Sequence, residues 1–168
     1  VVVGVADNGC GMDREGLVNA LRYGSKQRPD PSSLGKFGMG LKTASTAFCR
    51  KLSVISRPAE DQPVLKASWD LDAVVDHGWR IEIVPAAKYE IEILDKTALG
   101  GTGTLVIWEK VDRLLGEYKK QGGPFAQKAL KRIVDELYQH LAGVYQRFLD
   151  ETDTRARNVE IVLRGVKV

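Results

Sequence analysis

A short motif near the start of the chain combines a carboxylate with a sharp backbone turn. It runs from Asp7 to Met12 as Asp-Asn-Gly-Cys-Gly-Met, after an apolar, β-branched run (residues 1–6) that predicts a strand covered on both faces. A carboxylate there is costly unless it is hydrogen-bonded, and an exocyclic amine such as that of adenine would supply the partner. Gly9 and Gly11 would let the backbone approach a flat ring closely. A plain Asp-Asn-Gly turn without a ligand is the alternative.

A second glycine-rich segment, Gly-Lys-Phe-Gly-Met-Gly at residues 35–40, leads into a predicted helix over residues 38–48. Glycines at a helix entrance leave N–H groups free where the helix dipole is positive, which favours phosphate binding. Lys36 and Lys42 would add positive charge there, unless both simply face the solvent. Glycine-rich helix starts also occur without ligands, so the residues alone leave both interpretations open.

Spacing excludes three better-known loops. Leu41 separates Gly40 from Lys42, which puts the lysine out of register for a Walker A loop. A calcium loop starting at Asp7 would have Gly9 at its third position and Val18 at its twelfth, where ligands are required. The first motif also does not extend to a dinucleotide-binding fingerprint.

Together and in this order, the two motifs resemble the signature of the GHKL superfamily of ATP-binding domains, which have the Bergerat fold. A third element supports the resemblance, because Gly103-Thr104 leads into an apolar run (residues 105–108) like the family's Gly-Thr strand. Residues 38–43 look more like the version in MORC proteins and heat-shock chaperones than the version in histidine kinases. The late helix and strand resemble the entry to the transducer domain of gyrase and MutL.

The resemblance implies a role for each matching residue. Asp7 would accept the adenine amine, with Thr104 beside it through a water molecule. Gly9 and Gly11 would give the backbone its approach, and Met12 would pack on the ring. Residues 23–34 correspond to the ATP lid, which closes over bound nucleotide in this superfamily. The residues expected at the phosphates follow this lid: Gly35, Lys36, Phe37, Gly38, Met39, Gly40 and Lys42.

The family's catalytic glutamate and its Mg²⁺-binding asparagine lie on a helix upstream of the Asp-x-Gly-x-Gly strand, and this sequence begins at that strand. Asn8 and Asn19 are not substitutes, since neither lies on such a helix. Hydrolysis needs a positioned base and a metal clamp. We therefore expect the catalytic residues and the Mg²⁺ ligand outside the chain, with no metal site within it. The abrupt start favours a fragment of a longer ATPase over a degenerate nucleotide sensor.

The remaining pattern predicts an α+β fold. Asp13 offers a helix N-cap with Gly24 as the stop, and strands are expected at residues 52–56, 64–70, 80–84, 89–94 and 104–109. A long helix over 124–150 and a strand over 159–163 would follow. The expected architecture is a two-layer α/β sandwich of the Bergerat type, a mostly antiparallel mixed sheet covered by helices on one face. We expect an ATP-binding core at 1–123 and a transducer-like entry at 124–168.

Composition restricts the class of protein further. The 168 residues include 25 basic and 22 acidic side chains, a net charge of +3 without a basic cluster, so nucleic-acid binding is permitted but not indicated. No apolar run reaches the length of a membrane span and no signal peptide is visible. Cys10 and Cys49 lack metal-ligand spacing, as do His77 and His140. These features predict a cytoplasmic protein with reduced thiols.

The function expected from the sequence is an ATP-operated conformational switch. ATP and Mg²⁺ would be the cofactors, the lid would close over the nucleotide, and the closed form would give a homodimer acting on a protein or nucleic-acid client. Two alternatives stay open at this point. One is a histidine-kinase-type domain that phosphorylates a partner, and the other is a non-catalytic sensor of adenine nucleotides.

Overall fold

The computed structural model describes residues 1–22, 24, 38–78, 80–116, 118 and 122–168. The chain divides into two compact units, Val1–Leu114 and Leu115–Val168. The three motifs fall within the first unit.

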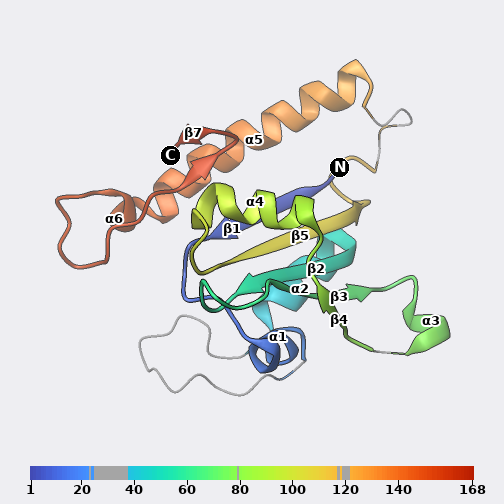
Figure 1. The fold of residues 1–168 in the computed structure, drawn as a ribbon. Helices are drawn as coiled ribbons and strands as arrows, with labels where there is room; N and C mark the ends of the chain where they lie inside the picture. Colours follow the sequence, from blue (N-terminus) through green and yellow to red (C-terminus); the bar gives the residue numbers. More distant parts are fainter. Residues whose placement is uncertain (23, 25–37, 79, 117, 119–121) are drawn as a thin grey trace. The chain divides into compact units, whose positions relative to one another are not determined.

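The first unit is built on a five-stranded sheet in the order β1-β5-β2-β3-β4, with every neighbouring pair antiparallel (Figure 1). This confirms the predicted α+β class, and the sheet that was predicted to be mixed and mostly antiparallel is antiparallel at each of these pairs. The strands are β1 (Val3–Asp7), β2 (Cys49–Arg57), β3 (Leu65–Asp70), β4 (Glu82–Pro85) and β5 (Gly103–Val111). The helices are α1 (Arg14–Leu21), α2 (Gly40–Phe48), α3 (Val74–His77) and α4 (Lys88–Ala98).

Helices cover both faces of this sheet rather than one. On one face, α1 and α2 close a core that includes Leu17, Leu21, Leu52, Val54 and Trp69. On the other face, α4 lies against a second core, which contains Ile55, Val64, Leu94, Ala98, Leu105 and Ile107 (Figure 1). The predicted single helical layer is therefore correct for α1 and α2, and α4 adds cover to the opposite face.

The strand predicted at residues 89–94 is wrong, because these residues belong to α4. The alternation of Ile91, Glu92 and Ile93 suggested a strand with one wet face. The residues buried in α4 are instead Glu90, Leu94 and Ala98, at intervals of four. A short alternating run fits both periods, and here packing against the sheet selects the helical one.

The first strand also differs from its prediction. The valine-rich run suggested a strand covered on both faces, but β1 lies at one end of the sheet, where its neighbour is β5. Val5 is 61% exposed, and Val3 is only partly buried against the core beneath α1 and α2. Its β-branched composition therefore reflects strand propensity rather than burial.

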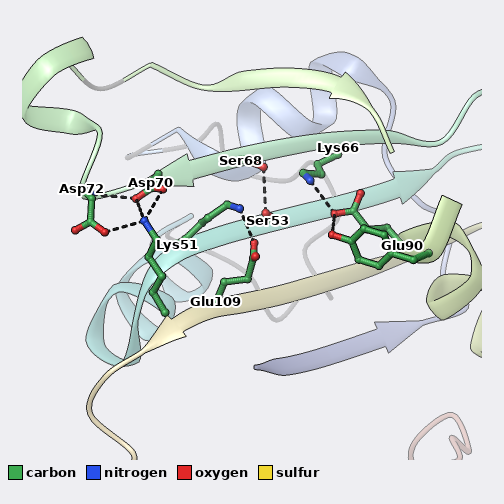
Figure 2. Close-up of polar contacts among 10 residues, drawn as sticks. Lys51, Ser53, Lys66, Ser68, Asp70, Asp72, Glu90 and Glu109 are labelled. Carbon is green, nitrogen blue, oxygen red and sulfur yellow. Dashed lines mark hydrogen bonds and ion pairs between the residues drawn. The ribbon is translucent and has the colours of Figure 1, made fainter. Parts of the chain in front are cut away.

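Polar contacts fasten α4 and neighbouring strands together (Figure 2). Lys66 Nζ on β3 donates to Glu90 Oε1 on α4 at 2.7 Å, and the same oxygen accepts from the Tyr89 hydroxyl at 3.1 Å. The hydroxyls of Ser53 and Ser68 are 3.1 Å apart across β2 and β3. Glu90 is 1% exposed, so its carboxylate belongs to the buried structure of the unit.

The second unit contains α5 (Pro124–Val144), α6 (Gln146–Leu149) and a hairpin of β6 (Val162–Leu163) and β7 (Val166–Lys167). The predicted helix over 124–150 is therefore interrupted at Tyr145, the residue that ends α5 and precedes α6. The predicted strand over 159–163 is reduced to two residues. Within the described part of the chain, no helix is both long and apolar enough to cross a membrane.

Candidate nucleotide-binding site

The end of β1 brings together two residues that the motifs predicted as partners. Antiparallel pairing of β1 with β5 places Asp7 directly opposite Thr104. Asp7 is exposed, and its Oδ1 accepts a hydrogen bond from the Gly9 amide at 2.8 Å. Its Oδ2 accepts no hydrogen bond from the described residues, which leaves an acceptor at the surface of the site.

Ser56, which sequence reasoning missed, lies at the centre of the site. Its Oγ accepts from the Met12 amide at 2.8 Å and lies 3.0 Å from both the Gly103 carbonyl oxygen and Thr104 Oγ1. Ser56 is fully buried on β2. A hydroxyl both donates and accepts, so this side chain joins three separate segments of the chain. The available signal was a second serine at the end of the apolar run 52–56.

Close backbone packing requires glycine at two positions of the site, Gly11 and Gly103. Gly11 has φ +65°, and a Cβ there would lie 2.0 Å from the carbonyl oxygen of Arg57. A Cβ at Gly103 would lie 2.3 Å from the carbonyl oxygen of Asp7. Thr102 Oγ1 adds a hydrogen bond of 2.7 Å to the Gly9 carbonyl oxygen. The loop after β1 is thus held against β2 and the loop before β5.

The first motif also sets the start of α1. Asp13 is the N-cap, and its Oδ1 accepts from the Gly16 amide at 2.8 Å, as predicted. The predicted stop at Gly24 comes slightly late, since the C-cap is Arg22. Met12 is partly buried against the core beneath α1, so its expected contact with an adenine ring remains a prediction.

The second motif is described only from Gly38 onward. Gly38 has φ +60°, Met39 is the N-cap of α2, and Gly40 is its first residue. Met39 is half-exposed, and no side chain caps this helix start. The backbone amides at the start of α2 therefore point outward at the positive end of the helix dipole, an arrangement that suits an anion. The other predicted phosphate residues, Gly35, Lys36 and Phe37, lie outside the described residues. The predicted lid over residues 23–34 also lies outside them, apart from Gly24.

Lys42 has a position that the sequence did not predict. We expected it to contact phosphate or to face the solvent, but it is 1% exposed. Its Nζ donates to the carbonyl oxygens of Ala20 at 2.9 Å and Arg22 at 2.6 Å. The solvent-facing alternative is wrong, and the ammonium group is directed to the end of α1.

A surface hollow of about 570 Å³ lies at the start of α1. It is formed by α1 and the turn between β2 and β3, and it includes neither Asp7 nor Thr104. Its lining residues are Asp13, Arg14, Glu15, Val18, Pro58, Gln62, Pro63 and Leu65. Because the hollow lacks both partners expected for adenine, we assign the candidate site to the Asp7 motif rather than to the hollow.

The described residues contain no group of three or more His, Cys, Asp or Glu side chains that could hold a metal ion. The groups present fit an adenine base and phosphates. They comprise an exposed carboxylate, buried hydroxyls beside it and free amides at a helix start.

This fold and arrangement of motifs define an ATP-binding domain of the GHKL class. Comparison with known families agrees, because the family of histidine kinase-, DNA gyrase B-, and HSP90-like ATPases matches residues 1–102. That match covers more than half of the chain, and the chain belongs to this family.

Two individual proteins are similar to parts of this chain. Over 133 residues the chain is 28% identical to the chaperone protein HtpG of Aromatoleum aromaticum, covering 71% of this chain and 19% of HtpG. The chain thus spans about a fifth of the length of this relative. The ATPase and transducer domains of DNA topoisomerase II from Balamuthia mandrillaris give a TM-score of 0.43 at 16% identity, covering 66% of this chain and 28% of that one.

Proposed function

We propose that the first unit binds ATP with the adenine amine on the Asp7 carboxylate and the phosphates at the start of α2. The observation that carries this proposal is the network at Ser56, which joins Met12, Gly103 and Thr104 beside Asp7. This network holds the acceptor for adenine on a rigid sheet, where little ordering is needed on binding. The Gly38–Gly40 amides would then bind the phosphates, with residues 35–37 completing the loop.

We further propose that ATP binding operates a conformational switch, with lid closure and homodimerisation, in a cytoplasmic parent ATPase. A γ-phosphate that orders a segment adjoining a helix start is a recurring form of such switching. The catalytic glutamate and the Mg²⁺ ligand would come from residues outside this chain. Two valines of β1 support a contribution from another segment. Val5 is exposed and Val3 is only partly buried, so they leave an apolar strip of β1 that another element would cover.

The adenine contact is tested by replacing Asp7 with asparagine. The variant would present an amide, whose NH₂ group repels the adenine amine and whose single oxygen is a weaker acceptor. We expect ADP affinity to fall by about 30-fold or more, in line with losing a hydrogen bond to a charged group. Calorimetric titration of ADP and a non-hydrolysable ATP analogue, with Mg²⁺, measures the change.

Asp112→Asn is a matched control, because Asp112 is an exposed carboxylate just after β5 and away from the motif. It should bind ADP like the wild type. Equal affinity in Asp7→Asn and the wild type would contradict the assignment of Asp7. If the folded wild-type chain fails to bind, and a version extended upstream also fails, the ATP-binding proposal is wrong.

A further inference from the structure

The side chain of Lys42 connects the starting turn of α2 to the end of α1. Lys42 belongs to the first turn of α2, and its Nζ donates to two carbonyl oxygens, those of Ala20 and Arg22. The last carbonyls of a helix lack intrahelical partners and carry partial negative charge. A buried ammonium group in turn requires acceptors. The pairing therefore satisfies both the helix-end carbonyls and the ammonium group of a side chain that is 1% exposed.

The two helices that Lys42 connects are anchored to different degrees. α1 is fixed at its start by the Met12 amide on Ser56, and along its length by Leu17 and Leu21, which are both fully buried. The start of α2 has no side-chain cap, and Met39, Gly40 and Thr43 are exposed. Among the described residues, Lys42 is therefore a polar side chain through which the exposed start of α2 is held to a well-anchored helix.

The length of α1 then sets the distance between the adenine-binding residues and the start of α2. α1 begins next to Met12, at the adenine end, and its eight residues span about 12 Å. We propose that Lys42 is a positioning residue, which clamps the phosphate-binding start of α2 to the end of α1 and so fixes its distance from the adenine-binding residues. This inference rests on the proposed function, and it assigns Lys42 a role through the amides rather than by contact with phosphate.

Comparing ADP with adenosine isolates this role, because adenosine lacks the phosphates. In Lys42→Met, which keeps an unbranched apolar side chain one atom shorter and removes the donors, we expect ADP affinity to fall about tenfold. Adenosine affinity should change by less than about twofold, since its partners lie on the sheet. Thr102→Val is the comparison variant, because it removes the Thr102–Gly9 hydrogen bond at the adenine end. It should weaken ADP and adenosine by the same factor.

Hydrogen exchange without nucleotide separates positioning from direct phosphate contact. The amides of Arg22 and Thr43 bond to the Val18 and Met39 carbonyls, at 3.0 and 2.9 Å, on the two sides of the clamp. Positioning predicts faster exchange of both amides in Lys42→Met. Direct contact with phosphate predicts unchanged exchange, and that result would overturn the proposal.

An unchanged ratio of ADP to adenosine affinity in a folded Lys42→Met variant would also overturn it. If circular dichroism shows that Lys42→Met does not fold, Lys42→Gln takes its place, because its shorter amide keeps donors but cannot reach both carbonyls. The same two readouts then apply with the same interpretation. A wild-type chain that binds no ADP would instead contradict the proposed function, so the two failures are distinguishable.

Discussion

Replacing Gly11 by alanine is expected to destabilise the first unit by roughly 3 kcal/mol, and to lower ADP affinity at least about tenfold. The new methyl group would lie 2.0 Å from the Arg57 carbonyl oxygen, at a backbone conformation with φ +65° that alanine disfavours. The neighbouring atoms are backbone, so relief requires the loop to move away from β2. That movement breaks the bond from the Met12 amide to Ser56. Urea unfolding and ADP titration measure the two effects.

Gly78→Ala separates the steric effect from the backbone effect. Gly78 has φ +67° and ψ −172°, and no described atom lies within 4 Å of a Cβ at that position. Its replacement should therefore cost only the backbone penalty of a conformation that glycine favours, about 1–2 kcal/mol. If both variants lose equal stability, the close approach of Gly11 to Arg57 has no energetic importance.

The second large effect is expected from Glu90→Gln. Glu90 Oε1 accepts from Lys66 and its Oε2 accepts from the Ala87 amide at 2.8 Å, so a glutamine must turn an NH₂ group toward one of these donors. Lys66 would also lose its carboxylate while its side chain is only 18% exposed. Breaking a buried pair in this way costs about 3 kcal/mol. Glu92→Gln on the same helix is the control, because its side chain is 63% exposed and its contact with Lys88 is 3.9 Å long.

The same pair predicts how stability depends on pH. Burial alone would raise the pKa of Glu90, but hydrogen bonds from Lys66 and the Ala87 amide outweigh it, so the pKa lies below its ordinary value of 4.5. Ionised Glu90 therefore stabilises the fold fully above pH 4.5, and this contribution is lost as the pH falls through the lowered pKa. The stability difference between wild type and Glu90→Gln should shrink below pH 4.5. A difference that stays constant there would contradict the ionised pair.

At alkaline pH, the stability contribution of the same pair is lost as the pH rises rather than as it falls. Burial lowers the pKa of Lys66, but the hydrogen bond to Glu90 and the negative charge of Glu90 together outweigh it and raise the pKa above 10.5. The contribution of protonated Lys66 is thus complete below pH 10.5 and is lost as the pH rises through the raised pKa. Urea unfolding at acidic and at alkaline pH would measure the contributions of ionised Glu90 and of protonated Lys66 separately.

The sequence predicted those parts of the fold that local patterns determine. Four later strands lie close to their predicted positions, and Asp13 caps α1 as expected, because alternation and capping depend on neighbouring residues. The order of the motifs identified the family, and the structure places Asp7 opposite Thr104. The roles of these residues in binding nucleotide remain predictions.

The sequence could not predict the contacts that depend on distant segments. Ser56 and Lys42 resemble ordinary polar residues until folding brings backbone groups of other segments to their side chains. Glu90 on α4 is similar, because its buried carboxylate depends on Lys66 on β3. The misassigned strand at 89–94 has the same cause, since the alternating isoleucines carry no information about what covers them. The roles of such residues depend on tertiary contacts, which local sequence patterns do not reveal.

The position of β5 in the sheet has a consequence for how the chain emerges from the ribosome. β1 is made first but has β5 as its sheet neighbour, and β5 begins at Gly103, just past the family match that ends at residue 102. Such pairing has high contact order, so β1 and its exposed valines must wait for most of the unit to be synthesised. A nascent chain halted before Gly103 has no partner for Asp7 and no Thr104 for Ser56. Nucleotide binding during translation would therefore report that the first unit has been completed.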